Sequence, residues 1–202
     1  MNDRHITLGI TGASGAIYGL RLGQELLRAG CRLSILISGP GFTVLKEECG
    51  LDWTGEEEMV TERLLRYFKV EAGQLSYHAE KDFFAPIASG SAAPDALVIC
   101  PCSMGTLARI AAGFSGNLLE RAADVMIKEG RQLLMVPRET PLSAIHLENM
   151  LKLSRLGVRL IPAMPGFYGA PQTVDDLVNF MVGKVLDILA IPHELSPRWE
   201  RR

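Results

Sequence analysis

The 202-residue sequence lacks several features that would assign it to a broad class of proteins. Acidic and basic residues are interspersed and leave a net charge of −2, so no basic stripe points to nucleic acid. The apolar runs have the length of strands and fall far short of a membrane span. The first residues do not have the layout of a signal peptide. We therefore expect a cytoplasmic protein that binds neither nucleic acid nor membranes.

Cysteine is also scarce. The four cysteines include one close pair, Cys100 and Cys102, and no second pair exists. A Cys-Pro-Cys spacing does not fit a zinc site. We therefore expect free thiols, most of them in the core, and no metal site.

What the sequence does contain is an alternation of short apolar runs with segments of helical periodicity. Apolar residues make up 48% of the chain, enough for the core of one domain, residues 1–190, followed by a charged tail, residues 191–202. The expected strands are residues 6–10, 33–37, 96–100, 133–136 and 158–161, and the expected helices are residues 17–29, 106–112, 118–128, 142–156 and 174–189. This alternation predicts an α/β protein with a doubly wound parallel sheet and helices on both faces.

Local signals indicate where some helices begin and end. Gly30 is expected to end the first helix, and Thr140-Pro141 to start a later one with proline in its first turn. Thr173 and Asp176 form a capping box before the last helix. Residues 42–91 have the weakest secondary-structure signals in the sequence. We expect one or two helices there and a loop around residues 79–91.

The joint between the first strand and the first helix is rich in small residues. Gly12, Gly15 and Gly19 follow one another there, but not at the dinucleotide-binding spacing. A glycine-rich turn lets backbone N–H groups approach an anion at the positive end of a helix. It can equally be a tight turn that needs glycine for close helix packing. The motif alone favours neither reading.

Small or polar loops follow the other expected strands as well. In a doubly wound sheet these loops meet at the carboxyl ends of the strands, where ligands bind. The polar side chains that they carry are Ser14, Ser38, Ser103, Thr106, Arg138, Glu139 and Tyr168. Their convergence on one edge favours a planar cofactor that carries a phosphate.

Several longer motifs make the interpretation more specific. They read, in chain order, TGASGAIYG, ASGS, VICPCSMGTLARIA, RAADVMIKE, PRETPL, HLENML and PGFY-x-x-PQ. From about residue 6 to residue 199 the chain resembles the flavin prenyltransferase (UbiX-like) family. The resemblance implies a Rossmann-like, flavodoxin-like fold that binds FMN, and a homo-oligomer, typically a dodecamer, with sites shared between subunits. It also implies transfer of a dimethylallyl group from dimethylallyl phosphate to N5 and C6 of reduced FMN, making prenylated FMN for a UbiD-type decarboxylase.

The resemblance also assigns roles to residues of this chain. The FMN contacts would be Gly12, Ala13, Ser14, Ser38, Ser103, Met104, Gly105, Thr106 and Arg138. The substrate phosphate ligands would be Arg121, Lys128, Tyr168 and Lys184. Catalysis would involve Ser14, Glu48, Glu139, Tyr168 and Lys128, with Phe83 and Trp199 offering aromatic faces to the developing allyl cation. Asp175-Asp176 lacks the third acid of a magnesium-binding element, which agrees with metal-independent transfer.

The same residues also have interpretations that involve no substrate or cofactor. Arg121, Lys128 and Lys184 are charged positions on amphipathic helices and could be solvated. Glu139 could simply favour the start of the next helix through the helix dipole. The chain also departs from the family after Tyr168, where Gly169-Ala170 replaces a histidine and a polar or basic residue.

Two other functions remain as alternatives. The first is an FMN-dependent cysteine decarboxylase of the related fold, which would need a Pro-x-Met-Asn-x-x-Met-Trp segment that this sequence lacks. The second is a non-catalytic flavin carrier, which would explain the FMN-binding edge but not Lys128, Glu139, Tyr168 and Lys184 together. The sequence leaves open whether the monophosphate or the diphosphate of the dimethylallyl group is preferred.

Overall fold

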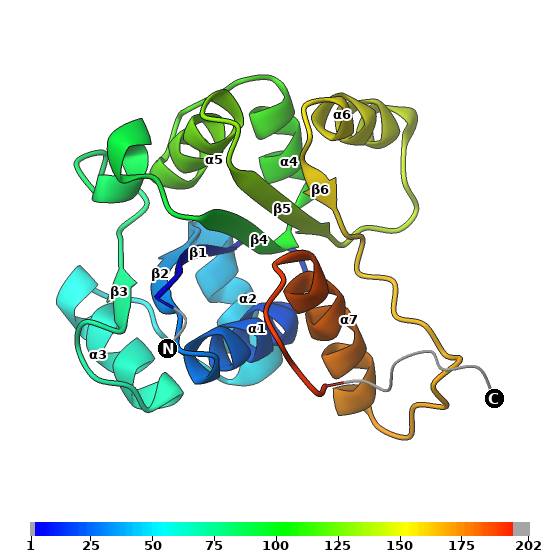
Figure 1. Ribbon diagram of the computed structural model, residues 1–202, viewed down its shortest axis with the longest axis horizontal. Coiled ribbons are helices and arrows are strands. Elements are labelled where there is room, and N and C mark those ends of the chain that lie inside the picture. Colours follow the sequence, from blue (N-terminus) through cyan, green and yellow to red (C-terminus); the bar gives the residue numbers. More distant parts are fainter. Residues whose placement is uncertain (1–2, 196–202) are drawn as a thin grey trace.

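The computed structural model describes residues 3–195, whose centre is one parallel β-sheet (Figure 1). The strands are β1 (His5–Ile10), β2 (Arg32–Ile37), β3 (Leu75–Tyr77), β4 (Ala96–Cys102), β5 (Gln132–Pro137) and β6 (Arg159–Leu160). They lie in the order β3-β2-β1-β4-β5-β6, and every neighbouring pair is parallel. The strand order reverses beside β1, between β1 and β4, as in other doubly wound sheets.

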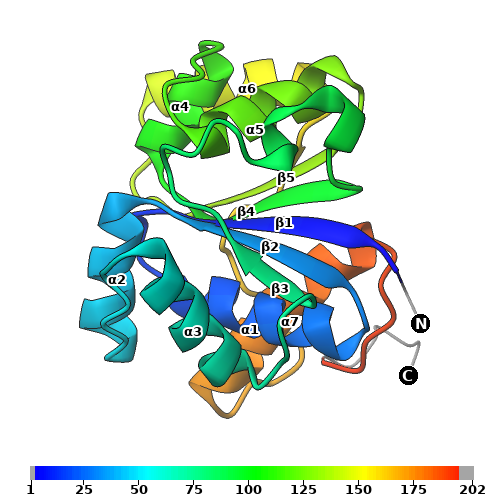
Figure 2. The ribbon, with the colours of Figure 1, turned by 90° about the vertical axis from the view of Figure 1, so that its left-hand side faces the viewer.

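Helices cover both faces of the sheet. They are α1 (Ala16–Arg28), α2 (Gly39–Cys49), α3 (Glu57–Phe68), α4 (Met104–Ala111), α5 (Leu118–Lys128), α6 (Ala144–Arg155) and α7 (Val174–Ile188), with the short 3₁₀ helices η1 (Pro86–Ala88) and η2 (Gly90–Ala92). Figure 2 shows α1, α2, α3 and α7 on one side of the sheet and α4, α5 and α6 on the other. None of the helices within residues 3–195 is long and apolar enough to cross a membrane.

The sheet is buried on both faces because its central strand is apolar at every position. All seven residues of β4 are buried. Leu97 and Ile99 pack with the α4–α5 side, whereas Val98 and Cys100 pack with the α1–α7 side. Side chains of a strand alternate between its faces, so one strand supplies both hydrophobic cores. This confirms the expected doubly wound sheet with helices on both faces.

Of two helix starts predicted from local sequence signals, one agrees with the structure and one does not. Thr173 accepts a hydrogen bond from the Asp176 N–H at 3.2 Å and Asp176 accepts one from the Thr173 N–H, so the capping box is confirmed. The prediction that Thr140-Pro141 starts a helix is wrong. Helix α6 starts three residues after Pro141, at Ala144, because Ser143 is the N-cap and its hydroxyl accepts the His146 N–H.

The region between residues 42 and 91 contains one element that was not expected. Helices α2 and α3 agree with the expectation of one or two helices, but Leu75–Tyr77 also forms a strand that pairs with β2. At the other end of the chain, Ile191 is buried and belongs to the core beneath α1 and α7. The first residue of the expected tail is therefore packed, and residues 196–202 lie outside the described part of the chain.

Candidate active site

The loops after β1 and β4 are joined by one buried threonine. The Thr11 hydroxyl donates to the Pro101 carbonyl oxygen at 2.9 Å and accepts the Ser103 N–H at 2.8 Å. The Thr11 N–H donates to the same carbonyl oxygen at 3.2 Å. These bonds fix the loop that carries Ser14 against the loop that carries Ser103. Thr11 is a further residue of this site, and its sequence signal is a polar side chain directly after a buried strand.

The start of α1 is occupied by a carboxylate of the same chain. Glu48 at the end of α2 accepts the N–H groups of Gly15 and Ala16 at 2.8 and 3.1 Å. Negative charge is stabilised at the first turn of a helix, which explains this contact. In the structure these two N–H groups are therefore bonded to Glu48, and the role of the joint in binding a phosphate or the edge of a cofactor stays a prediction. The structure does bring Glu48 beside the loop that carries Ser14.

Close packing explains the glycines of the joint. A Cβ atom at Gly12 would lie 2.4 Å from the Pro40 Cβ, and one at Gly19 would lie 2.3 Å from the Cys100 carbonyl oxygen. Gly15 has φ = 100°, in the left-handed region that favours glycine. Packing therefore explains Gly12 and Gly19, and backbone conformation explains Gly15, while contact of this joint with a ligand stays a prediction.

Two other helices start at the same edge of the sheet. Helices α2 and α4 begin directly after β2 and β4, with Ser38 and Ser103 as their N-caps. The Ser103 hydroxyl accepts the Thr106 N–H at 3.2 Å and donates to the Thr106 hydroxyl at 3.0 Å. The positive ends of two helices on either side of β1 can hold a phosphate. Met104 lies in the core, so only its main chain is available to a ligand.

Arg138 follows β5 and carries a buried donor without a partner. Its Nε is one of two buried side-chain polar atoms within residues 3–195 that make no hydrogen bond. A buried unpaired donor is costly, and a guanidinium group suits a phosphate or the polar edge of a flavin. Glu139 comes next and accepts the Thr140 N–H at 3.0 Å. Both residues line the same cavity of about 200 Å³.

Tyr168 and Lys184 both contact one aromatic residue of α7, Phe180. The Tyr168 ring, in the loop between β6 and α7, packs edge-on against Phe180 with ring centroids 5.7 Å apart. The Lys184 Nζ lies 5.4 Å from the centroid of the Phe180 ring. The sequence analysis did not single out Phe180, although its position four residues before Lys184 places both on one face of α7.

The other two expected phosphate ligands, Arg121 and Lys128, do not lie beside Tyr168 and Lys184. Lys128 is the last residue of α5, four residues before the start of β5, so it lies near the amino edge of the sheet. It pairs with Glu129 at 2.7 Å. The Arg121 guanidinium donates to the Ala88 carbonyl oxygen at 3.1 Å, in the ASGS segment, and to Asp124. Within one chain, these two cations are therefore not brought to the edge that carries Ser14 and Arg138.

The structure describes only one of the two aromatic residues that were expected to face the allyl group. Phe83 is half-exposed in the segment before η1, close to Glu80, whose carbonyl oxygen accepts the Leu118 N–H. Trp199 lies outside the described residues.

The cysteines are free, as expected, and Cys31, Cys100 and Cys102 are buried. Burial raises the pKa of the Cys100 and Cys102 thiols far above their usual range. Thiols that stay protonated are poor nucleophiles. The pair beside the edge of the sheet therefore serves packing rather than covalent chemistry.

A larger polar cavity, of about 670 Å³, lies away from all these residues. His5 and His78 line it, and the Nε2 atoms of both contact the buried Ser34 hydroxyl, at 2.8 and 3.3 Å. Burial lowers the pKa of both imidazoles. This cavity contains none of the residues expected to act in the site.

Comparison with known proteins identifies the family. The family model named Flavoprotein matches residues 1–186. The flavin prenyltransferase UbiX of Halalkalibacterium halodurans is 56% identical over 193 residues, which are 96% of this chain and 92% of that relative. The chain belongs to the UbiX flavin prenyltransferase family.

Solved UbiX structures have the same fold. AnUbiX (PadA1), in complex with FMN and dimethylallyl pyrophosphate, superposes with a TM-score of 0.87 at 35% identity, and each chain covers 100% of the other. A dodecameric FMN-dependent UbiX-like decarboxylase from Escherichia coli O157:H7 superposes with a TM-score of 0.85 at 40% identity, over 98% of this chain and 100% of that chain. These likenesses confirm the expected flavodoxin-like fold class.

Proposed function

We propose that the protein transfers a dimethylallyl group from dimethylallyl phosphate to N5 and C6 of reduced FMN and releases prenylated FMN. Membership in the UbiX family supports this reaction class. The observation in this chain that supports it best is the buried, unpartnered Arg138 Nε beside Glu139, at the edge where the loops after β1, β2 and β4 meet. Within residues 3–195 this donor lacks a protein partner, which supports a role for Arg138 in binding a polar ligand.

Different groups of this chain would bind the phosphate and the ring of FMN. The helix starts at Ser38 and Ser103, with the Thr106 hydroxyl, suit its phosphate. Arg138 suits the polar edge of the ring, and Gly12 to Ser14 border the same space. The bound and reduced flavin supplies the two nucleophilic atoms.

Proton transfer falls to the polar groups around that space. The leaving phosphate oxygen needs a proton, and Glu139 is the nearest acidic neighbour of Arg138 in the chain. Glu48 is fixed by two main-chain N–H groups beside Ser14 and can orient the Ser14 hydroxyl. Tyr168 completes this set from the loop before α7.

The substrate phosphate is bound by cations rather than by a metal ion. Tyr168 and Lys184 approach it from one chain, and Arg121 and Lys128 from another, because α5 ends at the opposite edge of the sheet. The site is thus shared between subunits of a homo-oligomer, and we propose a dodecamer. Phe84 is 99% exposed in the single chain, as expected of an apolar side chain that a neighbouring subunit would cover.

The remaining parts of the proposal concern the ends of the chain and its setting. Residues 1–190 would form the single FMN-binding domain, with Ile191 packed in its core. Phe83 would face the allyl group, and the proposed closing role of the tail with Trp199 lies outside the described residues. The protein acts in the cytoplasm, and a UbiD-type decarboxylase receives its product.

The deciding experiment is anaerobic and uses no added metal. Purified protein is mixed with reduced FMN and dimethylallyl phosphate, or separately with the pyrophosphate, and the released flavin is weighed by mass spectrometry. A gain of one C5H8 unit is expected. Unchanged FMN with both donors would refute prenyl transfer, and tight binding of that FMN would leave the cysteine decarboxylase and the flavin carrier to be tested.

A mixing experiment tests the shared site. Lys128→Ala and Arg138→Gln variants are each expected to be inactive as pure oligomers. Oligomers reassembled from equal amounts should recover about one quarter of the wild-type rate, because that fraction of sites receives an intact Arg138 from one chain and an intact Lys128 from its neighbour. No recovery, in mixed oligomers shown to contain both variants, would contradict a shared site.

A further inference from the structure

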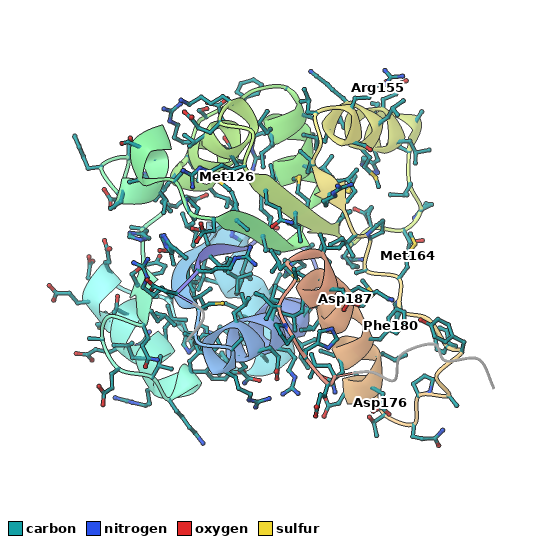
Figure 3. The ribbon with its side chains drawn as sticks, viewed as in Figure 1. Met126, Arg155, Met164, Asp176, Phe180 and Asp187 are labelled. Carbon is teal, nitrogen blue, oxygen red and sulfur yellow. The ribbon has the colours of Figure 1, made fainter. Side chains whose placement is uncertain are left out.

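Helix α7 presents an aromatic ring between two of the residues assigned to the substrate phosphate. Phe180 lies on the side of α7 that faces the loop between β6 and α7 (Figure 3). Its ring meets the Tyr168 ring edge-on, with centroids 5.7 Å apart and planes at 78°. The Lys184 Nζ lies over the same ring, 5.4 Å from its centroid. Both contacts have favoured geometries, edge-to-face for the rings and cation–π for the ammonium.

A glycine in the same loop confirms how closely the rings pack. A Cβ atom at Gly166 would lie 2.8 Å from the Tyr168 Cε1 and 3.0 Å from the Phe180 Cζ. The φ angle of Gly166 is not in the left-handed region, so any residue could adopt its backbone conformation. The glycine is therefore required by the space that the two rings occupy.

Phe180 contributes little to the core of the protein. It is half-buried and belongs to neither hydrophobic core cluster, whereas Met181 and Val182 beside it are buried. Lys184 is exposed, and within residues 3–195 no carboxylate pairs with it. The ring takes one side of the ammonium group and leaves its N–H donors for an anion.

We propose that Phe180 is a positioning residue that holds the Tyr168 ring and the Lys184 ammonium together as one binding unit for the substrate phosphate. This inference rests on the proposed function and names a residue that acts only through the other two. Without the ring, a long lysine side chain and an exposed loop tyrosine each have to be ordered when the phosphate binds, and that ordering reduces affinity.

The test uses three variants and one control in the FMN-loaded oligomer. Phe180→Leu removes the ring, Gly166→Ala pushes the two rings apart, and Phe180→Tyr keeps an aromatic face. Ile188→Ala shortens a partly exposed side chain one turn beyond Lys184 and serves as the control. Calorimetry measures binding of dimethylallyl phosphate and of inorganic phosphate, and steady-state assays measure KM and kcat.

We expect about tenfold weaker binding of dimethylallyl phosphate in Phe180→Leu and in Gly166→Ala, with a matching rise in KM. Phe180→Tyr and Ile188→Ala should bind as the wild type does. The affinity for FMN and the melting temperature should stay the same in all four variants. Wild-type binding by Phe180→Leu, or an equal loss in Ile188→Ala, would overturn the proposal.

The same measurements separate this inference from the proposed function. If the wild type binds dimethylallyl phosphate but forms no prenylated flavin, the function fails, and weaker binding by Phe180→Leu still supports the positioning role. If the wild type binds neither dimethylallyl phosphate nor inorganic phosphate, both are overturned. A lower melting temperature in Phe180→Leu together with weaker FMN binding would assign the ring a general structural role and refute the inference.

Discussion

Replacing Thr11 by valine tests whether one hydroxyl joins the two loops that border the flavin space. The hydroxyl is buried and makes two hydrogen bonds, to the Pro101 carbonyl oxygen and from the Ser103 N–H. Valine has nearly the same shape but forms neither bond. The carbonyl oxygen keeps the Thr11 N–H, whereas the Ser103 N–H loses its acceptor.

The expected magnitude follows from that unpaired donor. Leaving one buried N–H unsatisfied costs about 2 kcal/mol of unfolding free energy. For a chain of this length, that corresponds to a melting temperature lower by roughly 4–8 °C. Since only the Thr11 N–H bond to the Pro101 carbonyl then joins the loops that carry Ser14 and Ser103, we also expect several-fold weaker FMN binding.

Strand β1, which directly precedes Thr11, provides a matched control. Thr7 is fully buried on β1, but within residues 3–195 its hydroxyl has no hydrogen-bond partner. Thr7→Val removes a buried unpaired hydroxyl, so it should be neutral or stabilising by up to about 1 kcal/mol. Thr11→Ser keeps the hydroxyl and should restore FMN binding.

The assay is thermal unfolding of the FMN-free protein at one fixed protein concentration, because an oligomer's melting temperature depends on concentration. FMN titration by fluorescence quenching follows. Equal melting temperatures for Thr11→Val and Thr7→Val would refute the reasoning, since the two variants differ mainly in whether the lost hydroxyl was bonded.

Three further predictions concern packing, the start of α1 and pH. Gly19→Ala should lower the unfolding free energy by about 2 kcal/mol or more, seen as a lower melting temperature, because the new Cβ meets the rigid Cys100 carbonyl. Glu48→Ala should cost about 1 kcal/mol by urea unfolding, since the start of α1 loses the carboxylate that accepts two of its N–H groups, and an unchanged midpoint would contradict this. Burial lowers the pKa of His5 and His78, so the unfolded chain binds more protons and stability should fall as pH drops through the ordinary value of 6.5. A double glutamine variant at these two positions should flatten the curve of melting temperature against pH.

Most of the sheet could be predicted from the sequence because its central strands must be apolar. A parallel strand covered by helices on both faces reads as a continuous apolar run, as residues 96–100 do. Strand β3 gives no such signal. It has three residues with an exposed serine in the middle, and it extends the edge of a sheet already formed by β2.

The placement of the polar loops could be predicted for a topological reason. Residues that follow parallel strands meet at one edge, whatever their side chains, so Ser14, Ser38, Ser103 and Arg138 lie along the same edge. The partner of a helix start could not be predicted in this way. Glu48 reaches the start of α1 only because α2 packs beside it, which is a tertiary contact without a local signature.

The distance between Lys128 and Arg138 shows that sequence motifs alone cannot predict whether one chain holds a complete site. A crossover helix runs back from the carboxyl edge of the sheet to its amino edge, so the last residue of α5 lies on the far side from the loops. The six residues of β5 span about 20 Å between those edges, several times the reach of a lysine side chain. Every family motif can therefore be present in one chain while that chain holds no complete site. A second copy has to present its amino edge to this carboxyl edge, and the contacts that achieve this belong to the exposed surface rather than to the residues that perform the chemistry.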